Sequence, residues 1–366
     1  MSGARQITQD PSINHPTYFL ESSFTEDGRE ILFTSYRTGT PQLFAVGFES
    51  GETRQLTAGA GIHPYSAAIR GDRVFFVRAG GVWVLDLKGG GLKSGEARLI
   101  AQFDGQLGEA APDASGEWLV AAIKLRDGGN GMVCGRQDGS EWRLIPYPRT
   151  VIHPQFHPLE PEWIEFAGDP APRMHRVRRD GTGMECLYEH GNDEFVVHET
   201  FLGKTGDIVF TVWPRLLCRM DWTSREIRTI AEFNAWHITP DEQGARVLCD
   251  TNHPDTGIWL IDVATGERRR VCESKATNQG SQWKLSRYAL KEDFVAAQKN
   301  NLSWMETPTD TVYGPQWTHP HPAFSQDEQR ITFTSDCTGT SQVWVAELPV
   351  PGKASLPGKT SLPGKL

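Results

Sequence analysis

The stretch ILFTSYRTGTPQLFAV, residues 31–46, recurs near the other end of the chain as ITFTSDCTGTSQVWVA, residues 331–346, with eight of sixteen positions identical. Weaker copies begin at Arg73, Asp207 and Ala245. Each copy predicts an apolar strand, a turn with glycine or aspartate, a second strand, and a polar hairpin into a third. The repeat starts near residues 18, 62, 107, 151, 196, 235 and 319. Seven units of short strands predict an all-β fold, a seven-bladed β-propeller.

The two ends of the chain predict how the ring closes. The motif RQLT at residues 54–57 ends the first unit, and RQIT at residues 5–8 precedes every unit. The last unit lacks such a strand, so we expect the N-terminal strand to complete the last blade and cover its edge. We therefore predict one propeller domain over residues 1–349, with an insertion at 276–315 containing a short helix, and a disordered Pro/Gly/Lys tail at 350–366.

Composition excludes several classes of protein. The chain has 366 residues, 38% hydrophobic and 23% charged, and a net charge of -9, which gives no attraction for nucleic acid. No apolar run is long enough to span a membrane, and the N-terminus carries no secretory signal. Six scattered cysteines without a C-x-x-C spacing indicate buried thiols in a reducing cytoplasm. Whether the protein is a monomer or a dimer is open at this point.

The segment Gln316-Trp317-Thr318-His319-Pro320-His321-Pro322 concentrates candidate metal ligands. In an extended chain His319 and His321 point to the same side, about 7 Å apart. Imidazoles suit zinc, manganese, iron, nickel or copper, and the amide oxygen of Gln316 favours manganese or another ion that accepts oxygen ligands. The alternative is a His-Pro-rich turn with two solvated imidazoles.

Polar residues also recur at one position of the repeat. Seven or eight residues before the turn that follows each first strand, every unit has His or Glu: Glu21, His63, Glu109, His153, His198, His237 and His321. The first strands of a propeller line its channel, so these residues are predicted to form a ring around one cavity. A channel lined by polar residues only because it holds water is the alternative. No G-x-S-x-G elbow or Walker loop indicates a serine hydrolase or a nucleotide site.

The C-terminal run Gln316-x-x-His319-Pro320-His321-Pro322-x-Phe324-Ser325-x-Asp327, followed by residues 333–339, resembles the signature of the oligogalacturonate lyases. That family consists of cytoplasmic seven-bladed propellers of pectin breakdown with TolB-like repeats. The similarity extends over most of the chain, through His15, Tyr18-Phe19, His153-Pro154, Arg173-Met174, His198-Glu199 and His237.

The resemblance implies a Mn²⁺ site, or a site for another divalent transition metal, formed by His237, Gln316, His319 and His321. It also implies His198 as the base and Arg173 as a substrate-facing cation. Further contacts to the sugar are weaker expectations at His63, His153, Glu199 and Arg215. The loop 168–172 and the segment Thr200-Phe201 depart from the family pattern, which leaves the identity of the sugar open.

The chemistry of β-elimination fits these residue types. The reaction removes the C5 proton of a uronate, and a metal ion with Arg173 would stabilise the charge that develops on the carboxylate. A neutral histidine, with a pKa of about 6.5, can accept that proton near neutral pH. The expected function is cleavage of short oligogalacturonides to unsaturated uronates. The alternatives are a lyase or epimerase for a different uronate oligosaccharide, and a non-catalytic TolB-like propeller that binds protein or glycan.

Overall fold

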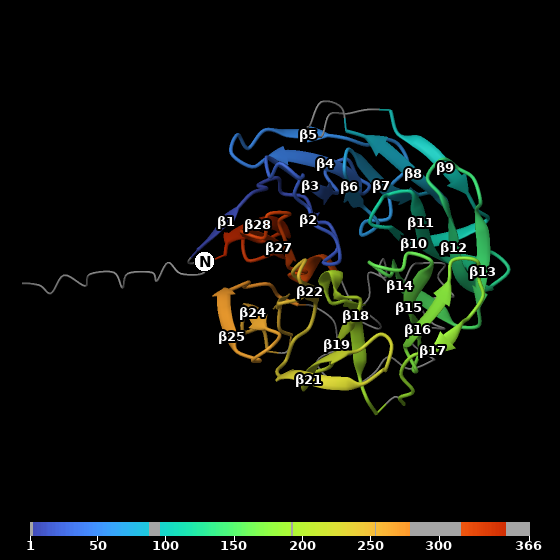
Figure 1. Cartoon of the computed structure of the whole chain (residues 1–366). Helices are drawn as coiled ribbons and strands as arrows, with labels where there is room; N and C mark the ends of the chain where they lie inside the picture. The colour runs from blue at the N-terminus through green and yellow to red at the C-terminus, as the bar shows by residue number, and fades with distance from the viewer. Residues whose placement is uncertain (1–2, 88–95, 192, 253, 279–315, 349–366) are drawn as a thin grey trace, which may run out of the picture.

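A computed structural model describes residues 3–87, 96–191, 193–252, 254–278 and 316–348. Its strands form seven antiparallel four-stranded sheets arranged as blades around a central channel (Figure 1). The prediction of an all-β seven-bladed propeller is confirmed. The only regular elements besides strands in the described part of the chain are two short 3-10 helices, η2 (Gly203–Thr205) and η3 (Gln316–Thr318).

Each blade is named here by its order along the chain, and its strands run from the channel outward. Blade 1 contains β2 (Asn14–Pro16), β3 (Glu30–Ser35), β4 (Gln42–Gly47) and β5 (Thr53–Gln55). Blade 2 contains β6 (Ala68–Arg70), β7 (Arg73–Arg78), β8 (Gly81–Asp86) and β9 (Arg98–Gln102). Blade 3 contains β10 (Gly105–Pro112), β11 (Trp118–Leu125), β12 (Asn130–Arg136) and β13 (Arg143–Tyr147). Blade 4 contains β14 (Thr150–Phe156), β15 (Trp163–Asp169), β16 (Met174–Arg178) and β17 (Glu185–Cys186).

The remaining blades repeat this order. Blade 5 contains β18 (Val196–Phe201), β19 (Ile208–Val212), β20 (Leu216–Met220) and β21 (Ile227–Glu232). Blade 6 contains β22 (Ile238–Pro240), β23 (Arg246–Cys249), β24 (Ile258–Asp262) and β25 (Arg268–Cys272). Blade 7 contains β26 (Ala323–Phe324), β27 (Arg330–Ser335), β28 (Gln342–Glu347) and β1 (Ala4–Gln6).

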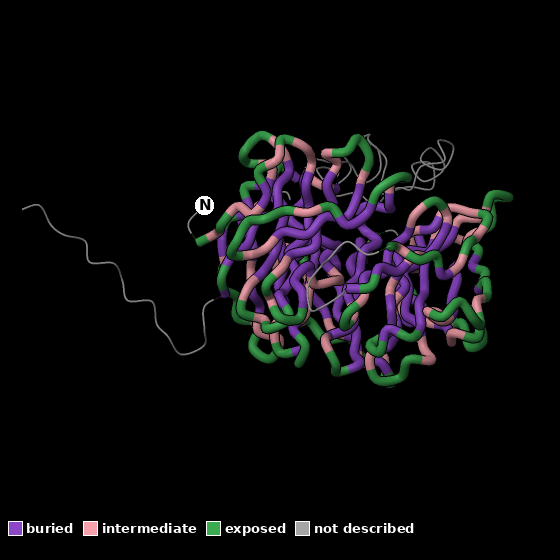
Figure 2. The backbone as a smooth tube through the Cα atoms, turned by 90° about the horizontal axis from the view of Figure 1, so that it is seen from above, coloured by how far each residue is buried: buried purple, intermediate pink, exposed green. Residues whose placement is uncertain are grey.

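The middle strands are apolar on both faces because each sheet is packed between two neighbours. In β7, the four residues Val74 to Val77 are all buried. Leu32 of blade 1 and Phe76 of blade 2 belong to one core cluster, whereas Phe75 belongs to the cluster shared with blade 3. Figure 2 shows the buried backbone in the interior of the ring and the exposed segments mainly at its turns. Burial on both faces explains the near-continuous apolar runs of the repeat.

Ring closure follows the prediction. Strand β1 pairs antiparallel with β28, with Gln6 opposite Trp344. Beyond the strand, the Thr8 hydroxyl donates a hydrogen bond of 2.7 Å to Gln342 Oε1 and accepts one of 2.9 Å from the Val343 N–H. The first and last segments of the described chain therefore share one sheet.

Removal of residues 1–8 is expected to lower the free energy of unfolding by at least about 3 kcal/mol. The deletion exposes the edge of β28 and removes several hydrogen bonds, each with a net value of about 1 kcal/mol. Urea unfolding followed by tryptophan fluorescence measures the change. A deletion of residues 1–3 is the matched control, and its free energy of unfolding should stay within about 0.5 kcal/mol of the wild-type value. Equal stability of the two deletion variants would argue against closure by β1.

Two predictions concern segments that lie largely or wholly outside the described residues. The insertion at 276–315, with its short helix, is described only as far as Asn278, and the tail at 350–366 not at all. Among the described residues, no helix has the length and apolar character needed to cross a membrane. All six cysteines are free thiols, consistent with the absence of a disulfide framework expected from their spacing.

Candidate metal centre in the channel

The first strands carry irregularities at the positions where the sequence predicted a polar ring. The pairing register shifts around Glu109 in β10, around His153 in β14 and around His198 in β18. Three ring residues adopt positive φ, with values of 52° at His153, 58° at His198 and 46° at His321. Such a conformation is uncommon outside glycine, and bulges that redirect a side chain are frequent beside functional sites.

Three of the predicted metal ligands lie together. The ring centroid of His237 lies 3.9 Å from that of His321 and 5.6 Å from that of His319, and the latter two are 5.9 Å apart. His237 directly precedes β22 of blade 6, whereas His319 and His321 precede β26 of blade 7. Gln316, on η3, is also buried. Adjacent blades thus bring together residues about eighty positions apart in the sequence.

Asp250 orients this cluster, and no motif in the sequence had indicated its role. Its carboxylate accepts hydrogen bonds from the His237 Nδ1–H and the His237 backbone N–H, both at 2.7 Å, and from the His321 N–H at 3.3 Å. Because Nδ1 of His237 donates to the carboxylate, its Nε2 is the nitrogen that can bind a metal. A carboxylate behind a histidine ligand is the usual support of such a site.

The residue types gathered here are those that a divalent transition metal prefers as ligands. Both ring nitrogens of His321 are buried and have no hydrogen-bond partner in the described part of the chain. Burial, followed by the neighbouring His237, holds the pKa of His321 well below its usual value, so the ring is neutral and offers a lone pair. Three imidazoles and an amide oxygen suit Mn²⁺ and similar ions. As placed in the structure, no group of three or more His, Cys, Asp or Glu side chains among the described residues could hold a metal ion.

His198 lies beside this cluster. Its ring centroid is 4.7 Å from that of His237, and the ring meets that of Trp236 edge-on at 4.4 Å. Nδ1 of His198 is buried without a hydrogen-bond partner among the described residues. Burial is the main cause, and His237 the next, of a pKa well below the usual value of histidine. A neutral imidazole therefore stands next to the candidate metal site with one nitrogen uncommitted.

Arg173 is held by two carboxylates. Its Nε and Nη2 donate to Glu199 at 2.7 and 3.1 Å, and its Nη1 donates to Asp169. All three side chains are buried. Burial raises the pKa of Glu199, but the Arg173 guanidinium outweighs this effect, so the pKa is lowered overall. Glu199, for which a contact with the sugar remains a prediction, pairs with Arg173 in the structure.

Replacing Glu199 with alanine is expected to lower the free energy of unfolding by about 3–5 kcal/mol, because one partner of a buried ion pair is removed. The pKa of Glu199 is lower in the folded state than in the unfolded state. The contribution of the pair is therefore complete above the unfolded value of about 4.3 and disappears as pH falls through the folded value. Urea unfolding at pH 7 and pH 3 measures it. Glu160→Ala, at an exposed site, is the control; equal losses in both variants would contradict the prediction.

A second arginine supports the loop that carries Arg173. Arg149, between β13 and β14, donates hydrogen bonds to the carbonyl oxygens of Pro170 and Pro172, the latter at 2.9 Å. The Arg173 N–H in turn donates to His190 Nε2 at 2.9 Å. The short loop at 168–172, which departs from the family pattern, is thus fixed from both sides.

The other expected sugar contacts occupy different places. His153 faces the channel and shares a hydrogen bond of 3.0 Å between its Nε2 and Tyr18 Oη. His63 is buried, and neither of its nitrogens has a hydrogen-bond partner among the described residues. Arg215 is exposed in the turn between β19 and β20. The structure does not bring Arg215 into the histidine cluster.

Tyr18 and Phe19 close the channel and were not expected in this role. They belong to the segment between β2 and β3, and Phe19 lies 5.2 Å from His237 and 5.5 Å from His198 between ring centroids. Thr239 Oγ1 lies 2.9 Å from the carbonyl oxygen of Phe19. Glu21, predicted as the ring member of this blade, instead pairs with Arg70 at the other end of the channel.

Comparisons with known proteins agree with this geometry. No protein-family model matches the chain. The chain is 22% identical to the oligogalacturonate lyase of Dickeya dadantii over 94% of its own length and 92% of that protein. It is also 22% identical to the oligogalacturonide lyase of Pectobacterium atrosepticum, with the same coverage. A segment of 51 residues is 43% identical to the Tol-Pal system protein TolB of Bordetella pertussis, over 14% of the chain.

Two solved structures share the whole fold. An oligogalacturonate lyase in complex with manganese superimposes with a TM-score of 0.77 and 19% identity, covering 95% of this chain and 94% of that one. The oligogalacturonate lyase of Vibrio parahaemolyticus gives a TM-score of 0.77 and 18% identity over 96% of this chain and 94% of that one. The chain is therefore similar to oligogalacturonate lyases over nearly its whole length in sequence, and it shares their seven-bladed fold.

Proposed function

We propose that this protein is a metal-dependent lyase that cleaves short oligogalacturonides by β-elimination and leaves 4,5-unsaturated uronates. The observation that carries the proposal is the neutral His198 against a cluster of His237, His319 and His321, in a chain similar to oligogalacturonate lyases. His237, Gln316, His319 and His321 would hold Mn²⁺ or another divalent transition metal. When bound, that ion supplies positive charge to a uronate carboxylate and so acidifies the adjacent C5–H.

The chain's own residues supply the remaining steps. His198, packed against the rings of Phe19 and Trp236, would take the C5 proton on its neutral ring. The C4–C5 double bond forms as the C4–O4 bond breaks, and the departing O4 of the leaving sugar takes a proton from water. Arg173 is fixed in place by Asp169 and Glu199, so its cation is preorganised and needs no rearrangement on binding. The Tyr18-Phe19 segment closes the channel beneath the cluster and defines the floor of the site.

The test is ultraviolet absorbance of the 4,5-unsaturated product when metal-loaded protein is mixed with di- and trigalacturonate. The proposal predicts a steady rise that stops on addition of a chelator and resumes with Mn²⁺. Metal binding without any rise would overturn the assignment of substrate. In that case, unsaturated product from another uronate oligosaccharide would identify a lyase of different specificity, which the divergent loop at 168–172 allows. If no uronate gave product, the remaining explanation would be a non-catalytic propeller that binds protein or glycan.

A further inference from the structure

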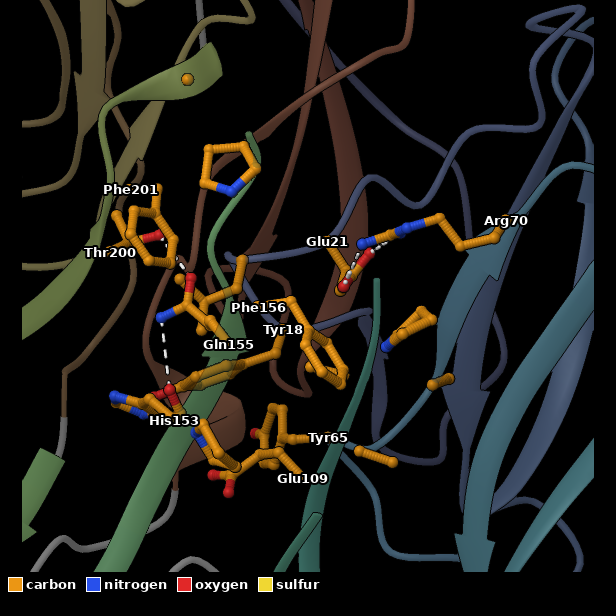
Figure 3. Close-up of a pocket in the computed structure, with 18 residues that line it drawn as sticks. Tyr18, Glu21, Tyr65, Arg70, Glu109, His153, Gln155, Phe156, Thr200 and Phe201 are labelled. Atoms are coloured by element: carbon orange, nitrogen blue, oxygen red, sulfur yellow. Dashed lines mark hydrogen bonds and ion pairs between the residues drawn. The ribbon is translucent and has the colours of Figure 1, made fainter. Parts of the chain in front are cut away.

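A cavity occupies the end of the channel opposite the histidine cluster. The candidate metal ligands precede the first strands of their blades, whereas the cavity is lined by residues at the far ends of the first strands, among them Pro112, Phe156 and Phe201. It measures ≈ 250 Å³ and is shown in Figure 3. Tyr18 and His153, joined by their hydrogen bond, stand between the cavity and the cluster. The cavity therefore lies on the other side of a shared wall, in which Tyr18 and Tyr65 pack against His321 with ring centroids 5.2 and 5.5 Å away.

Two buried polar atoms in the cavity wall have no partner in the described part of the chain. They are the hydroxyl oxygen of Tyr65, in a side chain 3% exposed, and one carboxyl oxygen of Glu109, 7% exposed. Figure 3 shows both residues at the inner end of the cavity, beside His153. An unsatisfied buried polar atom costs about 1–3 kcal/mol, so both positions favour a molecule that supplies hydrogen bonds.

The charge of the cavity selects against anions. Arg70, its one lining cation, is held in a bidentate pair by Glu21, with Nη1–Oε2 and Nη2–Oε1 distances of 2.5 and 3.0 Å. Glu109 is a third ionisable group, and burial raises its pKa to about 7. The net charge of the three is therefore zero or negative. A uronate carboxylate would therefore meet no unpaired arginine in the cavity wall.

The walls suit a sugar ring. Tyr18, Tyr65, Phe156 and Phe201 contribute aromatic surface, and aromatic rings pack against the C–H faces of apolar or amphipathic ligands. The volume lies just below the range of about 300–1,000 Å³ typical of small-molecule sites, which admits one ring but not an oligomer. We propose that this cavity is a second binding site, for a neutral hydroxyl-rich ring of monosaccharide size whose hydroxyl groups bond to Tyr65 and Glu109.

A matched pair of probes tests the proposal. D-galactose and D-galacturonate have the same ring and differ at C6, where one is neutral and the other anionic. Titration of the metal-loaded full chain, followed by ligand-observed NMR, is expected to show saturable galactose binding. Chelation of the metal should leave galactose binding unchanged. Ala111→Leu, which enlarges a side chain in the cavity wall, should weaken galactose binding at least tenfold and leave any metal-dependent galacturonate binding intact.

Two further variants separate binding from folding. Tyr65→Phe keeps the ring and removes only the unpartnered hydroxyl, and it should weaken galactose binding several-fold. Leu159→Ala, at a side chain that is 61% exposed and next to the cavity residue Pro158, should bind galactose like the wild type. Absence of galactose binding by the wild type, which would mean a cavity holding water only, overturns the proposal. Binding that survives unchanged in both Ala111→Leu and Tyr65→Phe overturns it as well. Neither result depends on whether the protein is a lyase.

Discussion

Turnover of digalacturonate and trigalacturonate is expected to fall by about 10²–10⁴-fold in the His198→Ala variant, the usual range for loss of a general base. The structure gives the reason: His198 presents a neutral ring beside the cluster of candidate ligands, with Nδ1 committed to no other group among the described residues. Initial rates of the rise in ultraviolet absorbance, measured at saturating substrate, give the change in kcat.

The control for this variant is the metal itself. His198 is not among the expected ligands, so calorimetry should show the same Mn²⁺ affinity in His198→Ala as in the wild type. A second variant, His198→Gln, retains hydrogen-bonding capacity and most of the side-chain volume but cannot accept a proton at neutral pH. It should be as inactive as alanine. Full activity of either variant would show that His198 is not the base. Activity in His198→Gln but not in His198→Ala would show that the His198 side chain acts through packing.

Mn²⁺ affinity is expected to fall by at least about 100-fold in His321→Ala, with activity lost at any metal concentration that saturates the wild type. Loss of a residue that only supports a ligand already costs about 10–100-fold in metal affinity, and loss of a ligand should cost more. Both nitrogens of His321 are buried and unpartnered in the described part of the chain, so no alternative partner compensates for an absent metal. Calorimetric titration of the metal-free protein measures the effect.

Asp250→Asn provides the graded comparison. Asp250 contacts His237 through its side chain and does not belong to the expected ligand set, so its loss should weaken Mn²⁺ by about 10–100-fold. The order of affinities should therefore be wild type, Asp250→Asn, His321→Ala. Wild-type affinity in His321→Ala would show that the metal, if one binds, lies elsewhere.

The propeller could be predicted from sequence because its information is local and repeated. Each unit of about forty residues repeats the same alternation of strand and turn, and eight identities between residues 31–46 and 331–346 relate the first blade to the last. The closing strand was visible for the same reason, since RQIT at residues 5–8 copies an outer strand. A repeat also fixes which strand lines the channel, so the histidine positions followed from counting.

The details of the site depended on contacts that no repeat encodes. The bulges that turn His153 and His198 inward arise from the positive φ at each residue, and histidine has no sequence signal for that conformation. The partners of Arg173 come from a different blade and from a short loop, so their carboxylates could not be assigned from spacing. Glu21 shows where counting residues back from each turn fails. The segment after β2 is irregular, so Glu21 does not occupy the ring position and pairs with Arg70.

Asp250 and the Tyr18-Phe19 segment illustrate two kinds of missing signal. Asp250 lies thirteen residues after His237, across one β-hairpin, so its pairing with the histidine could have been found once the strand register was known. Phe19 reaches His237 from another blade, and only the assembled ring brings them together.

Closure of the ring by β1 has a consequence for when the histidine cluster can form. His319 and His321 precede the first strand of blade 7, and the outermost strand of that blade is the N-terminal segment of the chain. Phe19, which packs against His237, follows the end of β1 by thirteen residues. Blade 7 completes its four-stranded sheet only when β1 pairs with β28, so His237 and His321 are held side by side only in the closed ring. If the cluster binds a metal as proposed, an incomplete ring is expected to be metal-free rather than partly active.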